Sequence, residues 1–523
     1  AAGLLGGVVC FGWKFLKYIR DRIGFVVVLL YDTTEENKFF VFIGVIESTV
    51  RPYWCLNGFV ELLTRDSGST VDFVRFGNDT TEPLTAGQWQ TGSAPVISNV
   101  TGSSIKRDID NTDTNSSSDW HYSQFTTPAG VNDVSCEDDS DEDGIPDCSE
   151  LPGSTFSGLP LHAWGARVNQ KDIFIEVDYM DSSDAGIIPH QTALEKVVSS
   201  FAEQGIVVHF DVGDLYHQAG GISVQDHDLG GGDQVTFRQY TPYNFNQGVE
   251  SLFHYKMANF DMRRKPIFHY MLMANSRNID GSAGSSGVAE LSGNDLMISM
   301  GKWGLSLDNE ISRNLTFNYQ ASTIMHELGH NLGLEHGGDE STNYKPNHLS
   351  IMNYLYQLRG LPTIGNNEGD RYYSSRYREN ANCAVQTADL TNSPFDSPEN
   401  FVMSYSHGLG SSIDENNIIE ANGLRYPGSA AVDFNCNADL TETLSQDTND
   451  DTAVTVLNDV DEWSLIELRF YTLFSGNRFG VHQQDSDQKD VSKHIQQRMI
   501  EEQAPPLKLL NEIKAAREKQ GIK

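Results

Sequence analysis

The feature that most constrains this 523-residue chain is the stretch HELGHNLGLEH, which begins at His326. His326 and His330 are four residues apart, so on a helix both imidazoles leave the same face, one turn apart. Gly333 follows three residues later and can take the left-handed conformation that ends a helix sharply. The turn would bring His336 back toward the other two histidines. The pattern therefore predicts three imidazoles around one metal ion, with each nitrogen at about 2.0–2.1 Å from it.

Glu327 lies between the first two histidines in sequence, and its carboxylate would point beside the metal. A carboxylate in that position can take a proton from water at the metal. Three neutral imidazoles, one open position and one base describe a catalytic rather than a structural zinc site. Chance would produce these five specified positions on the order of 10⁻⁵ times per chain of this length. We therefore interpret the three histidines as zinc ligands and Glu327 as a general base.

The motif HExxHxxGxxH resembles the signature of the metzincin zinc endopeptidases, and the resemblance covers roughly residues 170–410. It implies a Met-turn, a tight loop whose methionine lies beneath the metal. SIMNY at 350–354 resembles that loop and would supply Met352, whereas VMSY at 402–405, with Met403, is the rival segment. The resemblance also gives Tyr354 a role in binding zinc or the developing oxyanion. Gly337, after the third histidine, matches no named subfamily, so the cleavage preference stays open.

Hydrophobic periodicity around the motif predicts a compact layer of strands and helices. Strands are expected at 172–180, 206–212, 267–274 and 295–300, and helices at 191–204 and 318–332. The resulting fold class is α/β (α+β): a metzincin-like catalytic domain with a twisted mixed sheet and an active-site helix, preceded by a β-rich N-terminal domain.

The resemblance also implies where a substrate would lie. The fourth strand of the family borders the cleft and pairs with the substrate backbone, and residues 295–300 would be that edge. Residues 286–291 (SGVAEL) would be its approach. Ser286, Gly287, Val288 and Ala289 are therefore expected to contact substrate, the alternative being a buried strand with a flexible loop.

Changes in composition divide the chain into five parts. Residues 1–76 predict a β-rich domain with strands at 25–31, 39–46 and 59–63. The other four parts are a polar linker at 77–157, exposed over 77–135 and carrying a calcium repeat at 136–150; an upper catalytic subdomain with the zinc helix at 158–333; a lower subdomain with the Met-turn and a C-terminal helix (461–472) at 334–481; and a charged, helix-prone tail at 482–523.

An acidic loop suggests calcium as a second metal. DSDEDGIPD at 139–147 alternates carboxylates around a glycine, as calcium-binding loops do, and Cys136 and Cys148 are placed to close a disulfide around it. The segment resembles a thrombospondin type 3 calcium repeat; a solvated acidic linker is the alternative. The expected ligands are Asp139, Asp141, Asp143 and Asp147, with Glu150 as a further candidate. A weaker loop, lacking the glycine, offers Asp433, Asn435, Asn437 and Asp439.

Composition limits the partners and the compartment. The net charge of −35 argues against nucleic acid, whose binding needs clustered Lys and Arg. No apolar run reaches the roughly 18–20 residues of a membrane span, and the apolar stretch Ala1–Trp13 is read as a buried strand or helix rather than a short anchor. Six cysteines without a CxxC motif fit three disulfides in an extracellular or cell-surface protein. The oligomeric state stays open.

Two functional hypotheses follow. The first is a secreted zinc endopeptidase acting on a protein or peptide substrate. The second is a noncatalytic, calcium-stabilised surface or adhesion protein on a metzincin fold, and Glu327 argues against it because a binding module needs no base. Residues 1–135 are also proposed as a prodomain or accessory domain that cleavage within 77–135 would separate, the alternative being a permanent β-rich domain with no inhibitory role. A thiolate or carboxylate entering the open zinc position would then inhibit the enzyme.

Overall fold

The computed structural model describes residues 25–33, 38–46, 58–64, 67–95, 104–217, 221–244, 248–376, 382–469, 499–504 and 507–519. The chain divides into two compact units. The first comprises residues 1–138, 146–161 and 477–494, and the second comprises 139–145, 162–476 and 495–523. This division is coarser than the five predicted segments, whose boundaries stay predictions.

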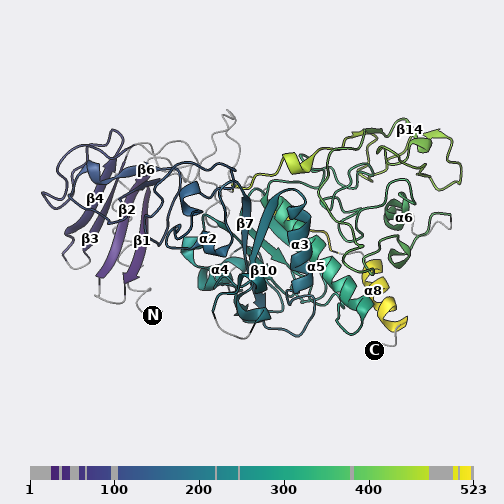
Figure 1. The fold of residues 1–523 in the computed structure, drawn as a ribbon, viewed down its shortest axis with the longest axis horizontal. Helices are drawn as coiled ribbons and strands as arrows, with labels where there is room; N and C mark the ends of the chain where they lie inside the picture. The colour runs from purple at the N-terminus through teal and green to yellow at the C-terminus, as the bar shows by residue number, and fades with distance from the viewer. Residues whose placement is uncertain are drawn as a thin grey trace. The chain divides into compact units, whose positions relative to one another are not determined.

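The first unit contains an antiparallel sheet whose strands follow one another in chain order, β1-β2-β3-β4 (Figure 1). The three strands expected from the sequence are confirmed as β1 (Phe25–Thr33), β2 (Lys38–Ile46) and β3 (Gly58–Thr64). The fourth, β4 (Thr70–Phe76), was not expected, because Asp72 and Arg75 interrupt its apolar character. Its apolar residues Phe73, Val74 and Phe76 are nevertheless buried.

The polar segment after this sheet is mostly exposed or half-buried over its described residues, as its composition predicts, but it also contains regular structure. It contains the antiparallel strands β5 (Ser104–Lys106) and β6 (His121–Ser123). Trp89 is buried edge-on against Phe73, with ring centroids 5.5 Å apart. The side chain of Arg107 forms ion pairs with Asp72 (2.7 Å) and Asp113 (3.1 Å). The strands were not expected, because few apolar residues suffice when polar side chains satisfy the backbone of a packed loop.

The second unit is built on a seven-stranded mixed sheet with the order β17-β11-β12-β10-β7-β8, while β9 pairs with β7. Strands β8, β7, β10 and β12 are parallel, and β11 and β17 are antiparallel to their neighbours. The coarse fold class, mixed α/β, is therefore confirmed. The strands are β7 (Lys171–Met180), β8 (Ile206–Asp211), β9 (Gln234–Val235), β10 (Phe268–Met273), β11 (Gly287–Glu290), β12 (Asp295–Ile298) and β17 (Met499–Glu501).

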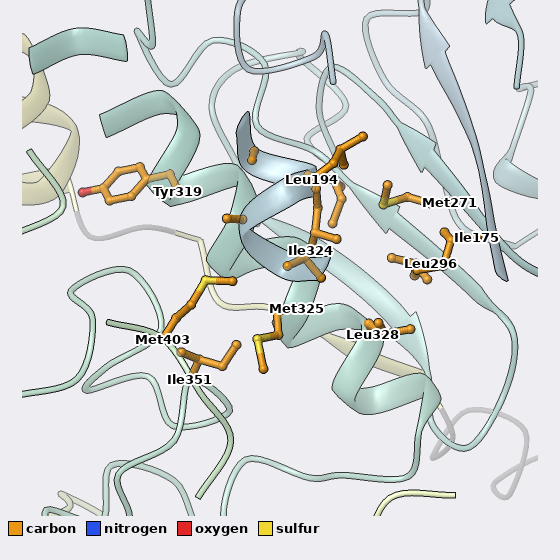
Figure 2. Close-up of a cluster of buried hydrophobic side chains, with 14 of the residues drawn as sticks. Ile175, Leu194, Met271, Leu296, Tyr319, Ile324, Met325, Leu328, Ile351 and Met403 are labelled. Atoms are coloured by element: carbon orange, nitrogen blue, oxygen red, sulfur yellow. The ribbon is translucent and has the colours of Figure 1, made fainter. Parts of the chain in front are cut away.

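The helices α3 (Gln191–Ala202) and α5 (Glu310–Asn331) pack with this sheet to form the main core. Figure 2 shows Leu194 of α3 beside Ile324 of α5, and Leu328 facing the sheet residues Leu296 and Ile175. Helix α5 starts eight residues before the expected 318, because the side chain of Asn309 accepts a hydrogen bond from the Ser312 N–H (2.9 Å) and caps it there. Residues 310–317 lack the strong apolar stripe on which the sequence prediction relied.

The strand expected at the sheet edge is instead internal. Strand β12 is flanked by β10 on one side and by β11 on the other. The predicted approach segment 286–291 itself forms β11, with Gly287 opposite Ile298 and Ala289 opposite Leu296. The sequence missed this because parallel and antiparallel neighbours of a buried strand leave the same apolar pattern.

The region after α5 is loop-rich, as expected, with a second core around Tyr356, Tyr372 and Phe434. The helix predicted at 461–472 is wrong over its described part. Only one 3₁₀ turn, η8 (Glu462–Ser464), forms there, and 470–472 lie outside the described residues. The regular elements of this region are α6 (Asp370–Arg376), β13 (Ile413–Asp414) paired with β16 (Val456–Leu457), and β14 (Ile418–Ile419) paired with β15 (Thr443–Leu444).

The remaining elements are short, except for one C-terminal helix. None of the helices in the described ranges combines the length and apolar character needed to cross a membrane. The stretch Ala1–Trp13 lies outside those ranges. The elements are α2 (Leu161–Trp164), α4 (Leu252–Asn259), α8 (Leu507–Lys519) and the 3₁₀ turns η1 (Ser117–Asp119), η2 (Asp147–Ser149), η3 (Gly213–Tyr216), η4 (Val224–Asp226), η5 (Met262–Arg264), η6 (Thr387–Asp389) and η7 (Glu420–Asn422).

Two disulfides occur among the described residues. The predicted Cys136–Cys148 bridge is confirmed, with a Cα–Cα distance of 5.9 Å. A second bridge joins Cys383 to Cys436 across 53 residues. The other two cysteines of the expected set, Cys10 and Cys55, lie outside the described residues.

Candidate metal centre

Helix α5 presents His326 and His330 on one face, and main-chain carbonyls fix both rings. The Nδ1–H of His326 donates to the Ile351 carbonyl (2.6 Å), and that of His330 donates to the Leu334 carbonyl (2.7 Å). With the proton held on Nδ1, each Nε2 carries a lone pair, which is the form that binds a metal. The two rings lie 4.8 Å apart between centroids.

The turn after α5 brings the third histidine to the same place, as its sequence predicts. Gly333 has φ +103°, and the Leu334 N–H donates back to the Gly329 carbonyl (2.9 Å). The His336 ring then lies 5.0 Å from that of His330 and 5.5 Å from that of His326. All three histidines therefore converge on one point, with their separations set by a single helix end.

The loop 350–354 packs against helix α5 next to the histidines. Met352 is buried against Gly329, where an added Cβ would lie 2.4 Å from the Met352 sulfur. The residue before it, Ile351, supplies the carbonyl that orients His326. Met403, the rival methionine, is buried in the same core, near Ile351 and Met325 in Figure 2. Met352 thus contacts the turn of helix that carries both histidines, and its assignment to a Met-turn stays a prediction.

Glu327 is fully buried, and neither carboxylate oxygen has a hydrogen-bond partner within the described residues. Burial raises the pKa of Glu327 well above its usual value, and the nearby charge of Glu502 raises it further. Gly287 of β11 approaches so closely that an added Cβ would lie 2.2 Å from Oε1 of Glu327. An orphaned buried carboxylate is costly to a fold, so its retention beside three imidazoles points to a chemical role.

Tyr354 borders the centre. Its ring lies 4.4 Å from that of His336, and its hydroxyl accepts a hydrogen bond from the Gln503 N–H (3.3 Å). Burial, with the charge and hydrogen bonding of Glu502, raises the pKa of Tyr354 above its usual value. The hydroxyl therefore stays protonated and can donate a hydrogen bond to an anionic group at the centre.

A fourth group, which the sequence did not single out, completes the cluster. Oε1 of Glu502 lies 3.0 Å from Nε2 of His326 and 3.4 Å from Nε2 of both His330 and His336. A tetrahedral ion with bonds of about 2.0–2.1 Å has edges of about 3.3 Å between its ligands. The three distances match those edges, so the donor set fits a metal ion. No spacing signal could have identified Glu502, because it is 166 residues from the nearest histidine of the set.

The pKa values of the two buried carboxyl groups, Glu502 and Glu327, are shifted in opposite directions. Burial opposes the ionisation of Glu502, but its contacts with the three histidines, His326 foremost, hold its pKa well below the usual range while no metal is present. Glu327 has no such partners, and its pKa is raised. The two carboxylates therefore differ in their partners: Glu502 contacts the three histidines, and Glu327 has no hydrogen-bond partner among the described residues.

The residues expected to bind substrate lie on β11, with Ser286 immediately before it. The outer edge of β11 is paired with β17, since Val288 is opposite Glu501 and Ala289 is opposite Ile500. Ser286 supplies a carbonyl to the Ser299 N–H (2.7 Å). The substrate role of Ser286, Gly287, Val288 and Ala289 stays a prediction.

The acidic loop forms a second candidate metal site in the second unit. One carboxylate oxygen from each of Asp139, Asp141 and Asp143 lies within 4.8 Å of the others. Gly144, at φ +94°, turns the chain so that its N–H donates to Asp139 (3.1 Å). Burial raises the pKa of Asp139, which shows how poorly solvated the group is. Asp147 and Glu150 belong to the first unit.

The weaker acidic loop is held together by its own hydrogen bonds. Asp433 accepts from the N–H groups of Asn437 (3.1 Å) and Ala438 (2.7 Å). The side-chain amides of Asn435 and Asn437 both contact Glu442, and Asp439 accepts from Thr441. These hydrogen bonds join groups of the same loop to one another. The assignment of calcium to this loop stays a prediction.

Comparison with known proteins leaves the site to be interpreted from its own chemistry. No protein-family model matches the chain, and no match was found among curated proteins or among solved structures.

Proposed function

We propose that this chain is a zinc-dependent endopeptidase of the metzincin type. The observation that carries the proposal is the convergence of three histidine Nε2 atoms beside the buried, unpartnered carboxylate of Glu327. Imidazole nitrogens with one carboxylate suit zinc, whereas calcium and magnesium prefer all-oxygen sites. The motif at 326–336 and the methionine loop at 350–354 are what relate this arrangement to metzincins.

His326, His330 and His336 would hold the zinc. When bound, zinc supplies a Lewis acid that polarises the scissile carbonyl and lowers the pKa of water. Glu327 would accept a proton from the attacking water and pass it to the leaving amine as the carbon–nitrogen bond breaks. Burial raises the pKa of Glu327, and a carboxylate of higher pKa accepts the proton of the first step more readily.

Other residues would orient the peptide. The protonated hydroxyl of Tyr354 is placed to donate a hydrogen bond to the developing oxyanion. The outer edge of β11, which β17 pairs with in this structure, can accept an extended peptide backbone. Gly287 keeps that backbone close to Glu327, since any larger residue would displace the carboxylate.

The proposal includes an extracellular or cell-surface location and a bound calcium ion. Two disulfides among the described residues are typical of oxidising compartments. Oxygen ligands gathered by Asp139, Asp141 and Asp143 suit a hard cation. The alternative function, a noncatalytic surface or adhesion protein, would leave the cost of burying Glu327 without a compensating role.

The decisive experiment compares Glu327→Gln with the parent chain. The variant should keep stoichiometric zinc, measured by inductively coupled plasma analysis, because no ligand changes. Casein hydrolysis should fall by roughly 10²–10⁴-fold, as expected for loss of a general base. Glu335→Gln, the same change outside the centre, should retain activity. Undiminished hydrolysis by Glu327→Gln would reject the mechanism.

A further inference from the structure

The C-terminal residues 499–504 lie along the open edge of the sheet beside the metal centre. Strand β17 pairs antiparallel with β11, and the next residue continues the contact, since the Glu502 N–H donates to the Gly287 carbonyl (3.2 Å). Adding a strand to an exposed edge is a common way to bind an extended peptide. This segment therefore occupies the surface that a peptide substrate would need.

Side chains hold successive residues of the segment in place. Arg277 makes two hydrogen bonds to the carboxylate of Glu501, at 3.0 and 2.7 Å. The Tyr344 hydroxyl donates to the side chain of Gln503 (3.1 Å). Between them, Glu502 directs Oε1 to the three histidines. The contacts are specific to sequence and position, which a strand that merely covers an edge would not require.

Helix α8 fastens the segment to the same unit. Its residues Leu509 and Ile513 are 2% and 1% exposed and belong to the core that contains α5. Glu512 of α8 accepts a hydrogen bond from the hydroxyl of Thr387 (2.6 Å). A ligand tethered in this way competes at an effective concentration that is commonly millimolar, so a substrate must displace a favoured neighbour.

We infer that Glu502 is the fourth ligand of the metal and that residues 499–504 keep the enzyme latent by filling its peptide groove. The inference rests on the proposed function. A carboxylate at the fourth position takes the place that the attacking water needs, while β17 takes the place of the peptide backbone. Inhibition by a carboxylate was expected from the N-terminal block, but the carboxylate that reaches the centre comes from the other end of the chain.

Cobalt substitution tests the ligand assignment without an activity measurement. The full chain, Glu502→Gln and the control Glu518→Gln are loaded with Co²⁺, and their visible ligand-field bands are compared. Replacing an anionic oxygen ligand should shift the bands of Glu502→Gln, whereas the exposed Glu518 should leave them unchanged. Identical spectra for all three proteins would overturn the assignment.

Turnover tests the latency. Zinc-loaded Glu502→Gln should hydrolyse casein about tenfold faster or more than the parent chain, because a larger fraction of molecules has a free groove. Glu502→Ala provides a second variant, with folding checked by circular dichroism. Equal rates for an active parent chain and both variants would overturn the latency.

The double variant Glu502→Gln/Glu327→Gln separates this inference from the proposed function. Loss of the gained activity in the double variant supports both. If cobalt spectra shift but neither Glu502→Gln nor the parent hydrolyses protein, the endopeptidase proposal fails while Glu502 stands as a metal ligand. If hydrolysis depends on Glu327 but not on Glu502, the proposed function stands and the inference fails.

Discussion

The three-histidine centre and the acidic loop are both candidate metal sites of the second unit, yet they are built in opposite ways. Carbonyls of Ile351 and Leu334 orient two of the histidine rings without any metal ion. The acidic loop crowds three carboxylates within a five-residue stretch. Because like charges at this distance repel, we expect the loop to keep its conformation better with a cation bound. The fold orients the first site by itself, whereas the second would depend on the proposed ion.

A single buried histidine, His348, sharpens the contrast between the two sites. His348 is buried between carboxylates, with Nδ1 2.8 Å from Asp459 and Nε2 3.0 Å from Glu462. Both ring nitrogens of His348 therefore face carboxylate oxygens, so neither nitrogen is available to bind a metal. At His326 one nitrogen faces a carbonyl and the other likewise faces a carboxylate oxygen, Oε1 of Glu502, but the Nε2 atoms of His330 and His336 point at that same oxygen. What surrounds the second nitrogen distinguishes a metal ligand from a buried ion pair.

The largest expected effect follows from removing a ligand of the preorganised site. His330→Ala should abolish stoichiometric zinc binding and reduce casein hydrolysis by at least the roughly 10²–10⁴-fold expected for Glu327→Gln. Its melting temperature should change only modestly although its zinc is lost, because the α5 core lies largely on the other faces of the helix. His407→Ala, at an exposed position, is the matched control. Full zinc occupancy in His330→Ala would contradict the assignment of the three-histidine centre as the zinc site.

The second prediction concerns the ion-dependent site. Calcium at about one hundred times its dissociation constant should stabilise the loop by about 2.7 kcal/mol, and EGTA should remove that stabilisation. The readout is proteolytic nicking between residues 133 and 150, which EGTA should accelerate. Asp141→Asn should lose the calcium response and, without calcium, be nicked more slowly than the parent, because one repulsive charge is gone. Asp138→Asn should behave like the parent, and equal nicking with and without calcium would make the segment an acidic linker.

The smallest expected effect concerns protons at His348. Burial alone would lower the pKa of His348, but the charge of Glu462 and hydrogen bonds to Asp459 and Glu462 outweigh it and raise that pKa, with Lys345 opposing them. The stabilisation is therefore fully present below the unfolded-state pKa of about 6.5 and is lost as pH rises through the higher folded value.

Melting curves between pH 6 and pH 9 test this sign. The melting temperature of the parent chain should fall more steeply with pH than that of His348→Gln, by a few degrees over the range. Zinc content should not differ between the two proteins. A parent chain that gains stability relative to the variant as pH rises would show that His348 is buried neutral.

Local patterns determined a good part of the molecule. The strands β7, β8 and β10, the helix α3 and the turn at Gly333 follow from periodicity and glycine conformation. The disulfide between Cys136 and Cys148 follows from a separation of 12 residues around a turn. In each case the signal lies within a few residues of the feature, so the chain needs no distant partner to define it.

The errors share the opposite property. The lack of structure expected at 77–135, the edge strand at 295–300 and the helix at 461–472 each follow from a local pattern that packing against another segment overrides. Trp89 finds the sheet residue Phe73, and β11 covers β12. The Glu462 carboxylate accepts hydrogen bonds from the ring of His348 and from the Ser406 N–H, and these contacts accompany a turn in place of a helix.

The sequence by itself determined the three histidines, the glutamate beside them and the turn that gathers them, because all five positions lie on one helix end. Only the tertiary structure decided which group stands opposite them. Glu502 reaches the centre through the pairing of β17 with β11 and through the packing of α8, and neither has a signature at the site's own residues. Contacts across more than a hundred residues depend on which surfaces are left open once the core has formed, and local spacing carries no record of that.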